Sequence, residues 1–269
     1  MSLAINNPLE YGVCRLSLVP VRKDPTHRSE QVTQLLFGDN YEVLEKSKDN
    51  KWIRIKIYFD QYEGWVELLQ HHFISSDYFE YINQAELKIT TDITSTMLYN
   101  KSPQLILMGS IIPISGSELF KMEEQFAFNG EAKSLGQKRE FEFLKNTAQK
   151  YLNVPYLWGG KSPFGIDCSG FTQSVFKICG YKLWRDATQQ AGQGKAIKNL
   201  AEALPGDLVF FKDSEDKITH VGILLDGDRI IHASGRVHVD HLNEEGILSL
   251  DTKIYTHQFS HIRRILAEG

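Results

Sequence analysis

The feature that most restricts the fold is a change in hydrophobic period about halfway along the 269-residue chain. Up to that point the apolar residues come in short runs separated by turn residues, which is typical of small antiparallel β domains. After it, residues 138–152 carry apolar side chains at helical spacing, and strands are predicted further on. Helices followed by strands indicate an α+β domain. We therefore predict small β domains in front of an α+β domain.

The β-rich half is predicted to contain two domains. Residues 1–72 are expected to form a small barrel from four β-type runs, at residues 31–37, 41–45, 52–58 and 63–68. Residues 73–135 are expected to form a second small β domain. In that domain, residues 105–108 and 111–114 flank a Gly-Ser break and predict a hairpin, and residues 123–131 predict a further strand with an Asn-Gly turn.

Residues 136–269 form the predicted α+β domain. Its first helix covers residues 138–152. A second helix follows the apolar repeat Phe171, Val175, Ile178 and Cys179, and Gly180 stands where a helix usually ends. The expected strands lie at residues 208–211, 219–225, 229–233 and 262–265.

Charge and hydropathy exclude several kinds of protein. The net charge is −4 and no basic tract is visible, which argues against a nucleic-acid partner. No run approaches the roughly 18 apolar residues of a membrane span. The first ten residues lack the basic start and the apolar stretch of a signal peptide. We therefore expect a cytoplasmic protein, and a trimmed N-terminus remains the alternative.

The chain has three cysteines, Cys14, Cys168 and Cys179. The odd count and the lack of a close-spaced pair argue against a disulfide framework and against a zinc knuckle. Cys179 lies on the apolar repeat of the second predicted helix and is expected to pack in the core. Cys14, in the first predicted domain, is likewise expected to have a structural and not a catalytic role.

Cys168 is the candidate nucleophile. Residues 164–170 lead directly into the predicted second helix, so Cys168 lies at a helix N-terminus. The unpaired N–H groups there lower the pKa of a thiol and can hold an oxyanion. The alternative is that Cys168 is a small buried residue, which is the more common fate of a free cysteine.

His220 and His232 are the candidate bases. They lie on two predicted strands joined by Asp-Gly-Asp at residues 226–228. A three-residue loop pairs Gly222 with His232 and places both imidazoles on one face, whereas a two-residue loop would place them on opposite faces. His220 could then accept the thiol proton while His232 fixes its tautomer. The alternative is a pair of ordinary polar or core histidines.

A metal site that uses His238 and His241 is a further alternative. His238, Asp240 and His241 cluster after Gly235, but no carboxylate spacing completes a recognisable coordination pattern. We therefore predict neither a metal nor an organic cofactor.

The α+β part resembles the NlpC/P60 peptidases. Five stretches carry the resemblance in the same order, namely residues 154–160, 167–171, 204–208, 219–223 and 231–233. It implies a papain-like fold in which a helix bearing the cysteine packs on an antiparallel sheet bearing both histidines. It further implies Cys168 as nucleophile, His220 as base, His232 as the polar third residue and Tyr156 as a group that polarises the substrate carbonyl.

The first part resembles a bacterial SH3 domain, and the second part would be another. The whole arrangement is similar to cytoplasmic γ-D-glutamyl-L-diamino acid endopeptidases that recycle murein peptides. In those enzymes the first SH3 domain restricts the groove to peptides with a free N-terminal L-Ala. The matching substrate-binding residues here are Glu30, Tyr62, Asp167, Ser169, Arg185, Asp186 and Thr188, the last in a place where relatives often have Ser.

The expected reaction is therefore hydrolysis of the bond between γ-D-Glu and the diamino acid of a murein peptide. An amidase or acyltransferase of the same fold is the first alternative, because a fold does not determine a function. A catalytically inactive wall-peptide binding protein is the second. Intact Cys168, His220 and His232 argue against it.

Overall fold

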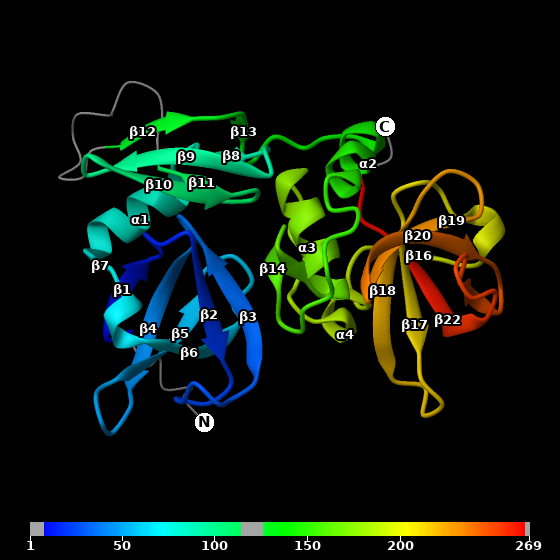
Figure 1. The fold of residues 1–269 in the computed structure, drawn as a ribbon, viewed down its shortest axis with the longest axis horizontal. Coiled ribbons are helices and arrows are strands. Elements are labelled where there is room, and N and C mark those ends of the chain that lie inside the picture. The colour runs from blue at the N-terminus through cyan, green and yellow to red at the C-terminus, as the bar shows by residue number, and fades with distance from the viewer. Residues whose placement is uncertain (1–7, 114–125, 267–269) are drawn as a thin grey trace. The chain divides into compact units, whose positions relative to one another are not determined.

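The computed structural model describes residues 8–113 and 126–266 (Figure 1). The chain divides into two compact units, Met1–Gly136 and Gln137–Gly269. Each unit has its own sheets and its own buried apolar cluster. None of the helices in the described ranges is long and apolar enough to cross a membrane.

The first unit begins with a seven-stranded sheet in the order β3-β2-β6-β5-β4-β1-β7. Apolar residues of its strands are buried in a common core, and Cys14 lies in that core with 1% of its surface exposed, so the structural role of Cys14 is confirmed. The four predicted strands are present. The strands are β1 Glu10–Val13, β2 Leu18–Arg22, β3 Gln31–Leu36, β4 Asn40–Lys46, β5 Trp52–Ile57, β6 Glu63–Glu67 and β7 Phe73–Ile74, with the 3-10 turn η1 Leu68–Gln70 before β7.

The rest of this unit holds a helix and two three-stranded sheets, ordered β10-β9-β12 and β11-β8-β13. Helix α1 was not predicted; the Ser75 side chain caps it by accepting a hydrogen bond from the N–H of Tyr78. The elements are α1 Ser76–Gln84, β8 Lys88–Thr90, β9 Thr94–Tyr99, β10 Ser102–Leu107, β11 Ile111–Ile112, β12 Phe126–Asn129 and β13 Ala132–Ser134.

The predicted hairpin across Gly109 and Ser110 is wrong. Strand β10 pairs with β9, and β11 pairs with β8 in the other sheet. Gly109 has φ of 90°, and the chain passes from one sheet to the other there. Of the strand predicted at residues 123–131, β12 is confirmed, and residues 123–125 lie outside the described ranges.

The second unit contains a closed sheet. Its strand order is β16-β22-β17-β18-β19-β20-β21, and β21 also pairs with β22, so the strands from β17 to β22 close on themselves. The strands are β16 Lys195–Ile197, β17 Leu208–Lys212, β18 Ile218–Leu224, β19 Arg229–Ser234, β20 Arg236–Leu242, β21 Gly246–Leu248 and β22 Tyr255–Arg264, with the 3-10 turn η2 Leu200–Glu202.

The helices of this unit are α2 Phe141–Gln149, α3 Cys168–Ile178 and α4 Ala187–Gln190, and a short hairpin joins β14 Lys161–Ser162 to β15 Gly165–Ile166. Helix α3 packs against β18 and β19 (Figure 1). Every residue of α3 is buried, and Cys179 directly after it is fully buried, so the core role of Cys179 is confirmed. Gly180 ends the helix with φ of 85°, as predicted.

Candidate active site

Cys168 is the first residue of α3. Asp167 caps this helix, and its side chain accepts a hydrogen bond of 2.6 Å from the N–H of Gly170. The backbone N–H groups of Val221 and Ser169 point to the Cys168 sulfur. Val221 follows His220 directly on β18, so the fold brings the cysteine to the strand that bears the predicted base.

The expected low pKa of Cys168 is wrong for the resting protein. Only 7% of the Cys168 surface is exposed, and this burial raises the pKa of its thiol to about 12. The negative charge of Asp167 raises the pKa further, whereas the Val221 N–H and the Arg185 charge lower it. The loss of hydration therefore raises the pKa of the Cys168 thiol by more than the N–H groups at the helix N-terminus lower it. The resting residue is a neutral thiol, and a thiol of this kind needs a base to become a nucleophile.

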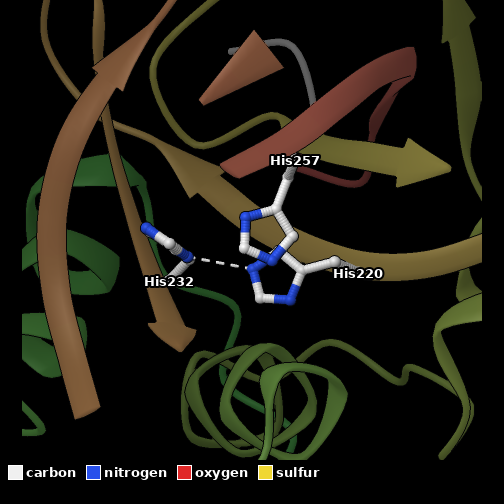
Figure 2. A group of neighbouring side chains, drawn as sticks. All are labelled: His220, His232 and His257. Carbon is white, nitrogen blue, oxygen red and sulfur yellow. Dashed lines mark hydrogen bonds between the residues drawn. The ribbon is translucent and has the colours of Figure 1, made fainter. Parts of the chain in front are cut away.

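The predicted histidine pair is present. Strands β18 and β19 pair Gly222 with His232, and the N–H of Leu225 donates to the carbonyl of Arg229. This is the register of the three-residue loop. Nε2 of His220 lies 2.9 Å from Nδ1 of His232, and the two rings meet at 89° (Figure 2). A Cβ atom on Gly222 would come within 3.0 Å of the His232 Cβ, so the glycine does leave room for the pair.

Two further residues complete this group, and sequence reasoning assigned neither of them a place in it. Nε2 of His232 lies 3.2 Å from Oδ2 of Asp240 on β20. The ring of His257 on β22 stacks on His220, with centroids 4.0 Å apart and planes at 26° (Figure 2). Strand β20 pairs His238 with His232, so Asp240 shares their face. A prediction of β20 as a strand would therefore have found Asp240.

The stacked imidazoles are neutral at pH 7. Burial, followed by the neighbouring histidines, lowers the pKa of His220 well below its usual range. Burial and the proximity of His232 lower the pKa of His257 to about 4. A neutral imidazole can accept a proton, so His220 is in the form that a general base requires.

Three predicted substrate-binding residues meet beside the cysteine. Arg185, with 1% of its surface exposed, donates to both carboxylate oxygens of Asp167 at 3.0 and 2.5 Å and to Oγ of Ser169 at 2.9 Å. The N–H of Gly159 also donates to Asp167 at 2.8 Å. The bidentate ion pair therefore neutralises the carboxylate next to the nucleophile.

Tyr156 also lies in the neighbourhood of Cys168. Burial raises the pKa of Tyr156 to about 12, and the nearby Cys168 and Asp167 raise it as well. Its hydroxyl group therefore stays protonated near neutral pH and can donate a hydrogen bond.

The remaining predicted residues take no part in these contacts. Asp186 is the residue before α4, its N–H donating to the Gln189 side chain, and Thr188 is exposed on that helix. Glu30 and Tyr62 belong to the first unit. Glu30 is exposed with a Lys23 nitrogen at 3.7 Å, and Tyr62 packs against the core of the first sheet. Their roles stay predictions.

Two sets of side chains have nitrogen or oxygen atoms close enough to share a metal ion, His220 with His232 and His257, and His232 with His238 and Asp240. In both sets the His232 nitrogens already take part in the hydrogen bonds given above. His238 and His241, the alternative metal ligands, are not brought together in either set. His241 instead lies 3.0 Å from Asp228. The arrangement suits proton transfer better than metal binding.

Comparison with known proteins identifies the family of both parts of the chain. Residues 153–264 match the NlpC/P60 family, and residues 21–70 match the bacterial dipeptidyl-peptidase SH3 domain. The chain is 30% identical to the gamma-D-glutamyl-L-lysine dipeptidyl-peptidase of Bacillus subtilis (strain 168), over 88% of this chain and 81% of that protein. It is 26% identical to dipeptidyl-peptidase 6 of Lysinibacillus sphaericus, over 82% of this chain and 88% of that protein.

Solved structures show the same fold. A crystal structure of an NlpC/P60 family protein from Bacillus cereus ATCC 10987 matches 96% of this chain and 100% of its own with a TM-score of 0.76 and 20% identity. An NlpC/P60 endopeptidase from Photobacterium damselae subsp. piscicida matches 90% of this chain and 68% of its own with a TM-score of 0.71 and 16% identity. The chain therefore belongs to the NlpC/P60 family of cysteine peptidases, carries an N-terminal bacterial SH3 domain, and is related to the gamma-D-glutamyl-L-lysine dipeptidyl-peptidases.

Proposed function

We propose that this protein hydrolyses the amide bond between γ-D-Glu and the diamino acid of murein peptides that have a free N-terminal L-Ala. The observation that carries the proposal is the buried thiol of Cys168 beside the strand that bears His220. Nε2 of His220 lies 2.9 Å from Nδ1 of His232. The names of the relatives from Bacillus subtilis and Lysinibacillus sphaericus support a dipeptidyl-peptidase.

Acylation uses the neutral thiol and the neutral imidazole. His220 takes the thiol proton as the Cys168 sulfur attacks the carbonyl carbon, and a tetrahedral oxyanion forms. The N–H groups of the first turn of α3 and the hydroxyl group of Tyr156 are the donors assigned to that oxyanion. The His220 imidazolium then gives its proton to the leaving amine, the C–N bond breaks, and the L-Ala-γ-D-Glu acyl group stays on sulfur as a thioester.

Deacylation repeats these steps with water. His220 takes a proton from the water molecule, the hydroxide attacks the thioester carbonyl, and the C–S bond breaks. The thiolate recovers its proton from His220, and the dipeptide L-Ala-γ-D-Glu is released. Both half-reactions need the same unprotonated nitrogen on His220, so any change that protonates that nitrogen stops the cycle.

Recognition of the free N-terminus is the finer part of the proposal. We assign the α-ammonium group of L-Ala to Glu30 and the region behind its methyl group to Tyr62. Asp167, Ser169 and Arg185 form the polar network next to the nucleophile, and Asp186 and Thr188 are the further contacts. A free L-Ala occurs only on a peptide already released from the glycan, so we assign the protein to recycling of such peptides in the cytoplasm.

The test compares two pairs of substrates, and the members of each pair differ only at the N-terminus. The full-length protein is incubated with L-Ala-γ-D-Glu-meso-diaminopimelate, with its L-Lys counterpart and with the N-acetylated form of each, and L-Ala-D-Glu is followed by mass spectrometry. Cleavage of the free peptides alone, absent in Cys168→Ala and weakened in Glu30→Gln, is the expected result. Equal cleavage of the acetylated peptides would overturn the N-terminal selection. Absence of cleavage by reduced, folded protein would overturn the peptidase and favour the amidase or the binding protein.

A further inference from the structure

Asp240 is a buried carboxylate to which the proposed reaction assigns no role. It is 1% exposed, its Oδ2 lies 3.2 Å from Nε2 of His232, and its Oδ1 accepts a hydrogen bond of 2.8 Å from the N–H of Leu250. We propose that Asp240 is a positioning residue, which fixes the tautomers of His232 and His220 so that His220 presents an unprotonated Nδ1 to Cys168. This inference rests on the proposed function only for its kinetic consequence.

The first step of the argument is the charge of Asp240. Burial alone raises the pKa of this carboxyl group, but the hydrogen bonds from His232 and from the Leu250 N–H bring the net pKa below its usual value. Asp240 is therefore ionised near neutral pH. An ionised carboxylate accepts hydrogen bonds and donates none, so Nε2 of His232 must carry its proton.

The second step passes this requirement along the pair. In neutral His232 with a proton on Nε2, Nδ1 has only a lone pair and can only accept. Nε2 of His220, 2.9 Å away, must then be the donor. Neutral His220 with a proton on Nε2 has its lone pair on Nδ1. That is the one ring nitrogen that His232 does not occupy, and it is the nitrogen left for the thiol.

The opposite tautomers would disable the base. If His232 carried its proton on Nδ1, it would donate to Nε2 of His220, and Nδ1 of His220 would carry a proton. His220 would then offer a donor instead of a base. The distances between the heavy atoms are the same in both arrangements, so the charge of Asp240 selects between them.

The other neighbours of Asp240 are consistent with this role. Nε2 of His238 lies 3.8 Å from Oδ2 of Asp240, and the His238 ring lies against that of His232, with centroids 4.7 Å apart. Burial, followed by His232, lowers the pKa of His238. At 3.8 Å this contact is longer than a hydrogen bond, so His238 does not compete with His232 for Asp240. The Leu250 N–H donates to the other carboxylate oxygen. Neither group forces the carboxylate to take up a proton.

Asp240→Asn is the informative variant because it keeps the size of the side chain. The Leu250 N–H needs an acceptor, so the amide oxygen of Asn takes the position of Oδ1, and the NH₂ group faces Nε2 of His232. That NH₂ group donates to Nε2, which reverses the tautomers of both histidines. The expected variant is folded and has a base that points a proton at Cys168.

The matched control is Asp228→Asn. Oδ2 of Asp228 lies 3.0 Å from Nδ1 of His241, and the Asp228 side chain is 68% exposed and the His241 side chain 43% exposed. The substitution therefore makes the same chemical change at a second His–carboxylate pair of the same sheet, outside the proposed network. We expect it to leave the activity unchanged.

The first measurement needs no substrate. Long-range ¹H–¹⁵N spectra of the full-length protein labelled with ¹⁵N-histidine report which ring nitrogen carries a proton. We expect a protonated Nε2 and a bare Nδ1 for His220 in the wild type and in Asp228→Asn, and the reverse in Asp240→Asn. A protonated Nδ1 on wild-type His220, or the same tautomer in folded Asp240→Asn, would overturn the proposal.

The second measurement is the reactivity of Cys168. We expect the rate of iodoacetamide modification of Cys168 at pH 7, and kcat for the free peptide, to fall by about 10³- to 10⁴-fold in Asp240→Asn, with KM changed little. A rise in KM with unchanged kcat, or an unchanged modification rate, would contradict the role of Asp240. If the wild type cleaves no peptide, the peptidase proposal fails, while the spectra and the modification rate still decide the role of Asp240.

Discussion

Removal of the Arg185 guanidinium tests how strongly the buried ion pair stabilises the second unit. Arg185→Met keeps a long unbranched side chain but takes away the two hydrogen bonds to Asp167 and the one to Ser169. Asp167, with 5% of its surface exposed, is then left as a buried charge that retains the N–H groups of Gly170 and Gly159.

The expected loss follows from that remaining environment. Removing one partner of a buried ion pair costs about 3–5 kcal/mol, and the two N–H groups that stay on Asp167 favour the lower end, about 3 kcal/mol. Asp167→Asn instead leaves Arg185 unpaired and should cost a similar amount, since Asn caps the helix as well as Asp. In the double variant neither charge is left alone. The double loss should therefore be smaller than the sum of the single losses by about 2–3 kcal/mol.

Urea unfolding followed by tryptophan fluorescence measures these losses. The chain has four tryptophans, and Trp158 and Trp184 lie in the second unit. A background with Trp52→Phe and Trp65→Phe makes the emission specific to that unit, and all four variants of the cycle are compared in it. Single losses that simply add up in the double variant would refute the view that Arg185 and Asp167 stabilise the unit as a pair.

Three further predictions concern the histidine group and the oxyanion. His257 has a pKa of about 4 in the folded protein against 6.5 in the unfolded chain, so its contribution to stability is present above pH 6.5 and is lost as the pH falls towards 4, a loss on the order of 3 kcal/mol. His257→Phe should therefore reduce the difference between the free energies of unfolding at pH 7 and at pH 4.5. An equal difference in the variant would contradict the burial of a neutral His257. Gly222→Ala places a Cβ 2.8 Å from Ile230 and 3.0 Å from His232, so we expect His232 to be displaced and kcat to fall. The displacement should alter the ¹H–¹⁵N ring signals of His220 and His232, and wild-type kcat and signals would contradict a steric requirement for glycine at this position. Tyr156→Phe removes the hydroxyl donor and should lower kcat by about 10²-fold with KM and stability little changed, and an unchanged kcat would exclude Tyr156 as an oxyanion donor.

The sequence predicted those parts of the site that depend on local rules. Because side chains alternate along each strand, the sequence limited the hairpin at 226–228 to two registers, one for a three-residue loop and one for a two-residue loop. The structure has Gly222 opposite His232, which is the register of the three-residue loop. Helix α3 was predicted from its apolar repeat and its terminal glycine, and both ends agree with the structure.

The parts that were missed depend on contacts between distant segments. His257 lies in the first part of β22, whereas the sequence predicted a strand only at residues 262–265. Most residues of β22 are partly or fully exposed and show no clear alternation, so its pairing with β17 and β21 is needed to find the first part. The pKa of Cys168 was predicted in the wrong direction because a helix N-terminus is visible in the sequence, whereas burial of the thiol results from the whole fold. The hairpin at Gly109 failed because its strands find other partners.

Closure of the sheet through β21 and β22 also sets the lifetime of the catalytic arrangement. Strands β18 and β19 have bonded neighbours on both sides, so neither can detach without breaking two ladders. Fraying of an edge cannot expose the two histidines one at a time. The backbone amides of Gly222 and Ile223 should therefore exchange with deuterium only when the unit unfolds as a whole, among the slowest in the molecule. The proton-transfer geometry then lasts as long as the native state itself.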